Sequence, residues 1–237
     1  MRYVLALWAI VLLLNAGCSS PRPYTAVSAP LPSAEGIPLW QTAGPLRVGV
    51  DLYLEPERQR RVFDADFRAR GILPLLVVVQ NQGTELFHLR RSATTLSLPD
   101  TTERHPLPVA TVVGPPAAQP TQAENREPIP DSGDPHKVAT AAAVTAFVAA
   151  GLAEQRAEET KRRAWAARAA DYEAKMLQNT IVAPGTRVHG FVFFTSPAAH
   201  GFEDATLNLR VETLTSSGVE VQVPLRELGR VQEPPSK

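Results

Sequence analysis

Cys18 is the only cysteine in a chain of 237 residues, and its surroundings are distinctive. A single thiol excludes a disulfide framework within one molecule and leaves nucleophilic catalysis or covalent modification as its chemistry. The two preceding residues, Ala16 and Gly17, are small, and an uncharged stretch runs before them from Tyr3 to Leu14. Small residues let an extended segment enter a peptidase site without a steric clash. The context of Cys18 therefore favours modification over catalysis.

The other residues that could do chemistry form no motif. The chain has no Gly-x-Ser-x-Gly turn, and Ser216-Ser217-Gly218 is typical of a turn between two strands. Asp131-Ser132-Gly133-Asp134 lacks the spaced oxygen ligands and the final Glu of a calcium loop. No two histidines stand two or four residues apart, so the sequence predicts no metal and no cofactor. An enzyme would need a site assembled in space from the five histidines, which are His88, His105, His136, His189 and His200.

Residues 1–20 resemble the signal peptide of bacterial lipoproteins. Arg2, a 12-residue apolar stretch and then Leu14-Asn15-Ala16-Gly17-Cys18 follow the layout of the lipobox, with Asn15 where the family prefers leucine. The resemblance implies cleavage after residue 17 and lipid attachment at Cys18. The expected partner is therefore a membrane, bound through the lipid anchor. The residue after the cysteine is Ser19, as in those lipoproteins of the family that are sorted to the outer membrane. The alternative is an ordinary signal peptide with Cys18 as a free thiol.

Composition limits the class of protein. Lys plus Arg and Asp plus Glu each number 24, and this zero net charge argues against nucleic acid as a partner. The 12-residue apolar stretch is shorter than the roughly 20 residues of a membrane-spanning helix. The 22 prolines predict loops and strand edges rather than an all-helical body. Proline, serine and alanine dominate after Cys18, so residues 18–43 are expected to be a tether and residues 231–237 a disordered tail.

Alternating and continuous apolar segments predict a single β domain over residues 44–230. Residues 46–54 alternate, and residues 73–79 form an apolar run typical of a strand that is covered on both faces. The Asn81-Gln82-Gly83-Thr84 turn predicts a hairpin to residues 85–90. Further strands are expected at 95–98, 109–113, 188–194, 207–211 and 219–225. The prediction is mainly β: an immunoglobulin-like antiparallel β-sandwich of about seven strands. It carries a proline-rich loop over 101–136 and a helical insertion over 137–180.

The insertion is alanine-rich and predicts one helix or a helical hairpin. Residues 138–153 carry no charge, yet they span only about 24 Å as a helix, less than the ~30 Å of a bilayer core. Gln155, Glu159 and Arg162 interrupt the apolar stripe, so the middle is either exposed or broken near Gly151. The stripe through Trp165, Ala169, Tyr172 and Met176 is expected to be core. A second apolar face is either core, or a surface that docks on a partner or on a membrane. It contains Val144, Phe147, Val148 and Leu152.

These features lead to an expectation about function. The chain is expected to be a lipid-anchored protein of the cell envelope, at the outer membrane facing the periplasm. It would act as a non-enzymatic binding or scaffolding module for another envelope protein. Two alternatives remain: a carrier of a lipid or other apolar ligand, and an enzyme with a site assembled in space. Clustering of His88 and His189 with carboxylates would favour the enzyme.

Overall fold

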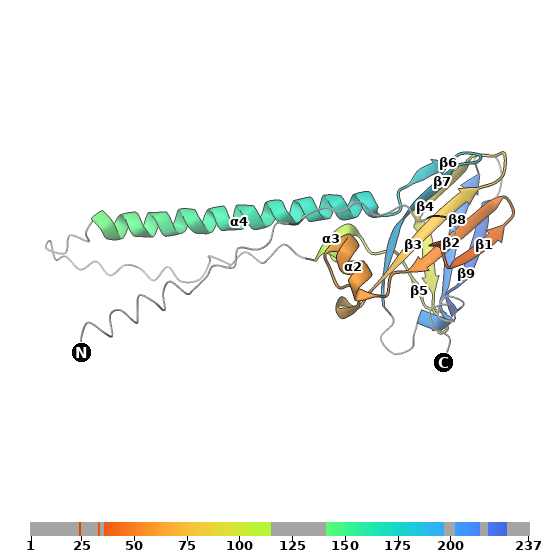
Figure 1. The fold of residues 1–237 in the computed structure, drawn as a ribbon, viewed down its shortest axis with the longest axis horizontal. Helices are drawn as coiled ribbons and strands as arrows, with labels where there is room; N and C mark the ends of the chain where they lie inside the picture. The colour runs from red at the N-terminus through yellow and green to blue at the C-terminus, as the bar shows by residue number, and fades with distance from the viewer. Residues whose placement is uncertain are drawn as a thin grey trace.

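Two antiparallel β-sheets face each other in the computed structural model of the protein (Figure 1). The structure describes residues 24, 33, 36–114, 141–196, 202–213 and 218–226, without the side chains of 141–150 and 203. The first sheet has the order β1 (Leu39–Ala43), β2 (Leu46–Leu52), β3 (Ile72–Asn81) and β7 (Arg187–Thr195). The second has the order β5 (Glu103–Arg104), β4 (Phe87–Ser97), β8 (Thr206–Thr213) and β9 (Val219–Pro224), and β6 (Thr180–Val182) pairs with β4.

The described residues thus form a β-sandwich with a helical insertion, as the sequence predicts. The helical elements are α2 (Pro56–Phe63), α3 (Val109–Val113) and α4 (Ala141–Lys175), with short 3₁₀ turns at Arg68–Arg70 and Phe202–Asp204. Nine strands are present where about seven were expected. That the sandwich follows the immunoglobulin connectivity stays a prediction.

The first sheet is buried on both of its faces, and β3 shows why its sequence is a continuous apolar run. Leu73, Leu75, Val77 and Val79 point into the space between the two sheets and join the sandwich core. Leu76 and Val78 alternate with them and point outward. A second apolar cluster covers this outer face, contributed by α2, α3, β7 and the end of α4. A strand with both faces buried needs apolar residues at every position rather than at alternate ones.

Several predicted segments differ from the structure. Residues 73–79 and 85–90 form no hairpin, because β3 and β4 lie in opposite sheets. Buried Asn81 fixes this corner: its side-chain amide donates to the carbonyls of Glu85 (2.7 Å) and Val182 (3.0 Å), and its oxygen accepts from the Gly83 N–H (2.9 Å). Residues 95–98 are the end of β4 instead of a separate strand. The β-bulge between Leu89 and Thr94 divides β4 into the two apparent strands.

Three further boundaries change. The predicted tether over 18–43 overlaps β1, which pairs with β2 from Leu39 onward. Residues 109–113 form α3 and not a strand, because Val112 is fully buried in the outer cluster and packing there overrides the β preference of valine. Within the predicted insertion, helix occupies 141–175 and β6 follows it. Residues 115–140, which contain most of the predicted proline-rich loop, and the predicted tail lie outside the described residues.

Helix α4 is continuous over 35 residues and leads away from the sandwich (Figure 1). At 1.5 Å per residue it is about 50 Å long. The predicted alternative of a break near Gly151 is wrong, and a glycine inside a helix of this alanine content costs only about 1 kcal/mol. The C-terminal end of α4 meets the sandwich beside α2 and α3, and its other end is remote from both sheets.

Candidate functional site

The last turns of α4, Trp165–Lys175, attach the helix to the sandwich; this segment is called the α4 root. Tyr172 is fully buried there, and its ring meets that of Phe63 on α2 edge to face at 5.3 Å. Phe63 in turn packs edge to face on Phe191 (4.7 Å) and Phe193 (5.5 Å) of β7. Each such ring pair contributes about 0.5–1.5 kcal/mol beyond the burial of its area. One aromatic cluster therefore joins the helix to the first sheet.

Two polar side chains of the root complete the end of α2. The Tyr172 hydroxyl donates to the Phe63 carbonyl at 2.5 Å, and the Lys175 ammonium donates to the Val62 carbonyl at 2.7 Å. Burial raises the pKa of Tyr172 to about 12, so the hydroxyl stays protonated and keeps donating. The last carbonyls of a helix lack partners within the helix and carry partial negative charge. The α4 root supplies both donors, and Lys175 is also paired with Asp171 (2.5 Å).

The chain that leaves the root passes directly over β7 at Gly190. The Leu177 N–H donates to the Phe191 carbonyl at 2.9 Å, and Met176 forms a parallel bridge with Phe191. A Cβ placed on Gly190 would lie 2.4 Å from the Leu177 Cα, which is closer than two such carbon atoms approach. Only glycine at this position lets the two backbones lie this close. The exit from α4 is therefore held at a fixed place on the first sheet.

The predicted core stripe of α4 is partly confirmed. Tyr172 and Met176 are fully buried, whereas Trp165 and Ala169 are half-buried. The Trp165 indole N–H donates to the Gly114 carbonyl at 2.7 Å, which ties the start of the root to the end of α3. On the N-terminal side of Trp165, the helix has no buried residue among those whose side chains are described.

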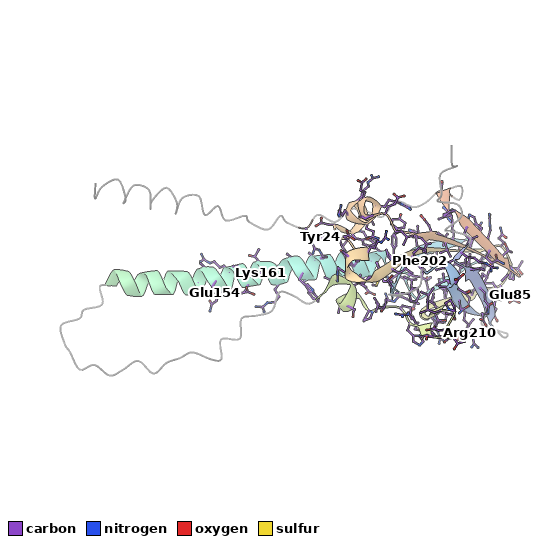
Figure 2. The ribbon with its side chains drawn as sticks, turned by 90° about the horizontal axis from the view of Figure 1, so that it is seen from below. Tyr24, Glu85, Glu154, Lys161, Phe202 and Arg210 are labelled. Atoms are coloured by element: carbon purple, nitrogen blue, oxygen red, sulfur yellow. The ribbon has the colours of Figure 1, made fainter. Side chains whose placement is uncertain are left out.

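Residues 151–164 form the exposed part of α4, called the α4 shaft. All but the half-buried Glu158 are exposed, and Figure 2 shows Glu154 and Lys161 on this stretch beyond the sandwich. Charged residues of the shaft pair with each other along the helix: Glu159 with Arg163 (2.6 Å) and Glu158 with Lys161 (2.7 Å). A charged surface on every side of a helix is typical of one that stands in solvent.

The predicted partner-or-core face lies on the shaft and beyond it. Leu152 is 48% exposed. Val144, Phe147 and Val148 lie within α4, but their side chains are outside those described. Residue 147 stands about 38 Å along the helix axis from buried Tyr172. This part of α4 leads away from the sandwich (Figure 1), and the role of the face, core or docking surface, stays a prediction.

Tyr24 contacts the α4 root, which the sequence did not indicate because this residue lies in the predicted tether. Its hydroxyl donates to the Asp171 carboxylate, its ring lies edge to face with Tyr172 at 6.3 Å, and the Arg168 guanidinium stands 4.9 Å from its ring centre. An aromatic residue in a proline-rich stretch was the only available signal. Tyr24 is thus held against the α4 root.

The histidines that the sequence offered for an enzyme site, His88 and His189, do not lie together. His88 is on β4 beside Glu212, in the second sheet, whereas His189 is on β7, opposite Val78 in the first. Burial, with the nearby charge of Arg187, lowers the pKa of His189. Among the described residues, no three His, Cys, Asp or Glu side chains gather where they could hold a metal ion. Cys18 lies outside the described residues.

Arginines of α2 and of the α4 root form ion pairs with nearby carboxylates. Arg58 binds Asp51 at 2.6 Å, and Arg60 binds Asp66 at 3.1 Å. Arg168 of the α4 root reaches back to Asp64 at 3.2 Å. These arginines are therefore occupied by carboxylates of the same chain.

Within the part of the chain that the structure describes, no helix has the length and apolar character needed to cross a bilayer. No family model matches the chain, and no curated protein and no solved structure matches it either.

Proposed function

We propose that the protein is a lipid-anchored lipoprotein of the cell envelope that presents helix α4 to another envelope protein. It acts as a non-enzymatic binding or scaffolding module at the outer membrane, facing the periplasm. The projection of α4 carries this proposal. A helix rooted in a buried aromatic cluster, with an exposed shaft on which Leu152 is 48% exposed, is arranged to present a surface away from its own domain.

The anchor part of the proposal is supported by residues 1–20. Their likeness to a lipoprotein signal peptide supports attachment of acyl chains at Cys18. Several acyl chains hold a protein on a bilayer stably, because each buried CH₂ contributes about 0.8 kcal/mol.

The partner part of the proposal is supported by the sequence of the far half of α4. Residues 138–153 carry no charge, and Ala142, Ala146 and Ala150 recur at a spacing of four. Small residues at this spacing permit a close approach between two helix backbones. A helix of another envelope protein suits this stretch better than a charged surface does, since the stretch offers no ion-pair partners.

Site-specific photocrosslinking in the native membrane tests the proposal. A photoreactive residue at Leu152 or Arg156 is expected to yield a discrete crosslinked product. The same residue at Glu85, at the opposite end of the sandwich (Figure 2), is the matched control and is expected to yield none. A second variant, Phe147→Ala, is expected to reduce the crosslink from Leu152 while leaving the melting temperature unchanged. Equal crosslinking from both ends would contradict a docking role for α4.

A further inference from the structure

Tyr24 makes three different contacts with the α4 root, although it stands 147 positions before Asp171 in the chain. Its hydroxyl donates to the Asp171 Oδ2 atom, and the Arg168 guanidinium stacks over its ring. The Tyr172 ring meets it edge on. Arg168, Asp171 and Tyr172 lie within two turns of one helix face. A hydrogen bond, a cation–π contact and a ring pair all hold the same side chain, so Arg168, Asp171 and Tyr172 form a specific binding site for Tyr24.

The Asp171 carboxylate in this binding site needs a hydrogen-bond donor where the Tyr24 hydroxyl lies. Asp171 Oδ2 also accepts from the Lys175 ammonium, and the Asp171 side chain is 13% exposed. A carboxylate this sheltered needs hydrogen bonds to replace the water it has lost. Burial, followed by the bond to Asp171, raises the pKa of Tyr24 above its ordinary value. The phenol therefore stays protonated at physiological pH and acts as a permanent donor.

We propose that Tyr24 fastens the N-terminal segment to the α4 root, so that an anchor at Cys18 holds this end of the sandwich within about 20 Å of the bilayer. This inference rests on the lipid anchor of the proposed function. Tyr24 stands six positions after Cys18, and an extended chain spans at most 3.3–3.6 Å per residue. Without the Tyr24 contact, the next buried residue among those the structure describes is Ile37, and the reach from Cys18 to Ile37 would be about 60 Å.

The contact also selects which end of the molecule faces the membrane. Tyr24, α2 and the α4 root lie together at one end, and Glu85 marks the other (Figure 2). A short connection at the root end keeps this end of the sandwich, and not the β3–β4 corner, next to the bilayer. Because α4 extends about 45 Å from the same end, it would lie along the bilayer surface rather than point into it. A 19-residue flexible connection from Cys18 to Ile37 would impose no such orientation, because its ends would sample many directions.

The first experiment measures the contact without any lipid. The mature chain, residues 18–237, is made without its leader, so that Cys18 is a free and solitary thiol that accepts a nitroxide label. Paramagnetic broadening is expected for the amide signals of Asp64 and Arg168 and not for that of Glu85. Tyr24→Ala is expected to abolish the broadening while the melting temperature stays within the range of Thr25→Ala, the matched control that should keep it. Absence of broadening in the parent protein, or its persistence in Tyr24→Ala, would overturn the proposal.

The second experiment measures the orientation on the bilayer. In the lipidated protein Cys18 is acylated, so a fluorescent donor attaches only to an introduced thiol at Ala69→Cys, near the root, or at Glu85→Cys. With acceptor-labelled lipids in the vesicle, energy transfer is expected to be higher from position 69 than from position 85. Tyr24→Ala is expected to remove this difference, and a difference that survives the substitution would count against the fastening. Failure of the protein to bind the vesicle at all would reject the lipid anchor while leaving the nitroxide result standing.

Discussion

Phe63 is the side chain on which the attachment of α4 depends most directly. It lies at the end of α2, is fully buried, and contacts the ring of Phe67 and rings from α4 and β7. Phe63→Ala is expected to reduce the free energy of unfolding by about 3–5 kcal/mol, because the cavity cannot be filled by rigid aromatic neighbours. Leu152→Ala removes an apolar side chain that is half in solvent, and it is expected to change stability by less than about 0.5 kcal/mol. Urea unfolding of both variants checks the contrast, and similar losses would contradict the separation into root and shaft.

His189 should make stability depend on pH. Burial lowers its pKa in the folded state below the ordinary value of 6.5, so the unfolded chain binds the proton more readily. Stability from this group is therefore complete above about pH 6.5 and declines as the pH falls below that value. The urea midpoint is expected to fall between pH 7.5 and pH 5.5, and to fall less in His189→Gln. His105→Gln, at an exposed position, serves as the control and should retain the pH dependence of the parent.

At the scale of elements, two glycines should respond oppositely to alanine. Gly190→Ala is expected to destabilise the protein by several kcal/mol, because the new Cβ would overlap the Leu177 backbone, which has no room to move. Gly151→Ala on the shaft meets no atom within 4 Å and should stabilise α4 by about 0.5–1 kcal/mol. Thermal unfolding of the pair measures the difference. Equal shifts would show that the chain does not cross β7 at Gly190.

The same elements show what sequence reasoning can reach. The strands at 46–52 and 188–194 and the long helix were predictable, since alternation, apolar runs and alanine content are local signals. The sheet partners were not, because the corner at Asn81 depends on a carbonyl of Val182, 101 residues away. The fate of residues 109–113 likewise depends on burial of Val112 among distant aromatic residues. For the candidate site, the stripe ending at Met176 was found, whereas Tyr24 and Gly190 gain their roles only from the folded chain.

At the scale of the whole molecule, attachment to the membrane is the property to test first. Cys18→Ala is expected to move the protein from the membrane pellet to the soluble periplasmic fraction, or to leave it unprocessed with its signal peptide. The reason is that acyl chains need the Cys18 thiol as their attachment point, and their loss removes the anchoring free energy. Ser19→Ala is the matched control and should remain in the pellet. Mass spectrometry that finds a free thiol at position 18 of the mature protein would refute the lipid anchor.

The rigid seating of α4 turns it into a lever arm. Its fulcrum is the aromatic cluster around Phe63 and Tyr172, and about 45 Å of helix extends from Asp171 to Ala141. A rotation of 10° at the fulcrum would displace the far end by about 8 Å over this length. Force applied by a bound partner at that end would be delivered, with mechanical advantage, to Asp171 and hence to Tyr24. In the proposed anchored arrangement, load on the tip and the orientation of the sandwich on a membrane would therefore be mechanically coupled.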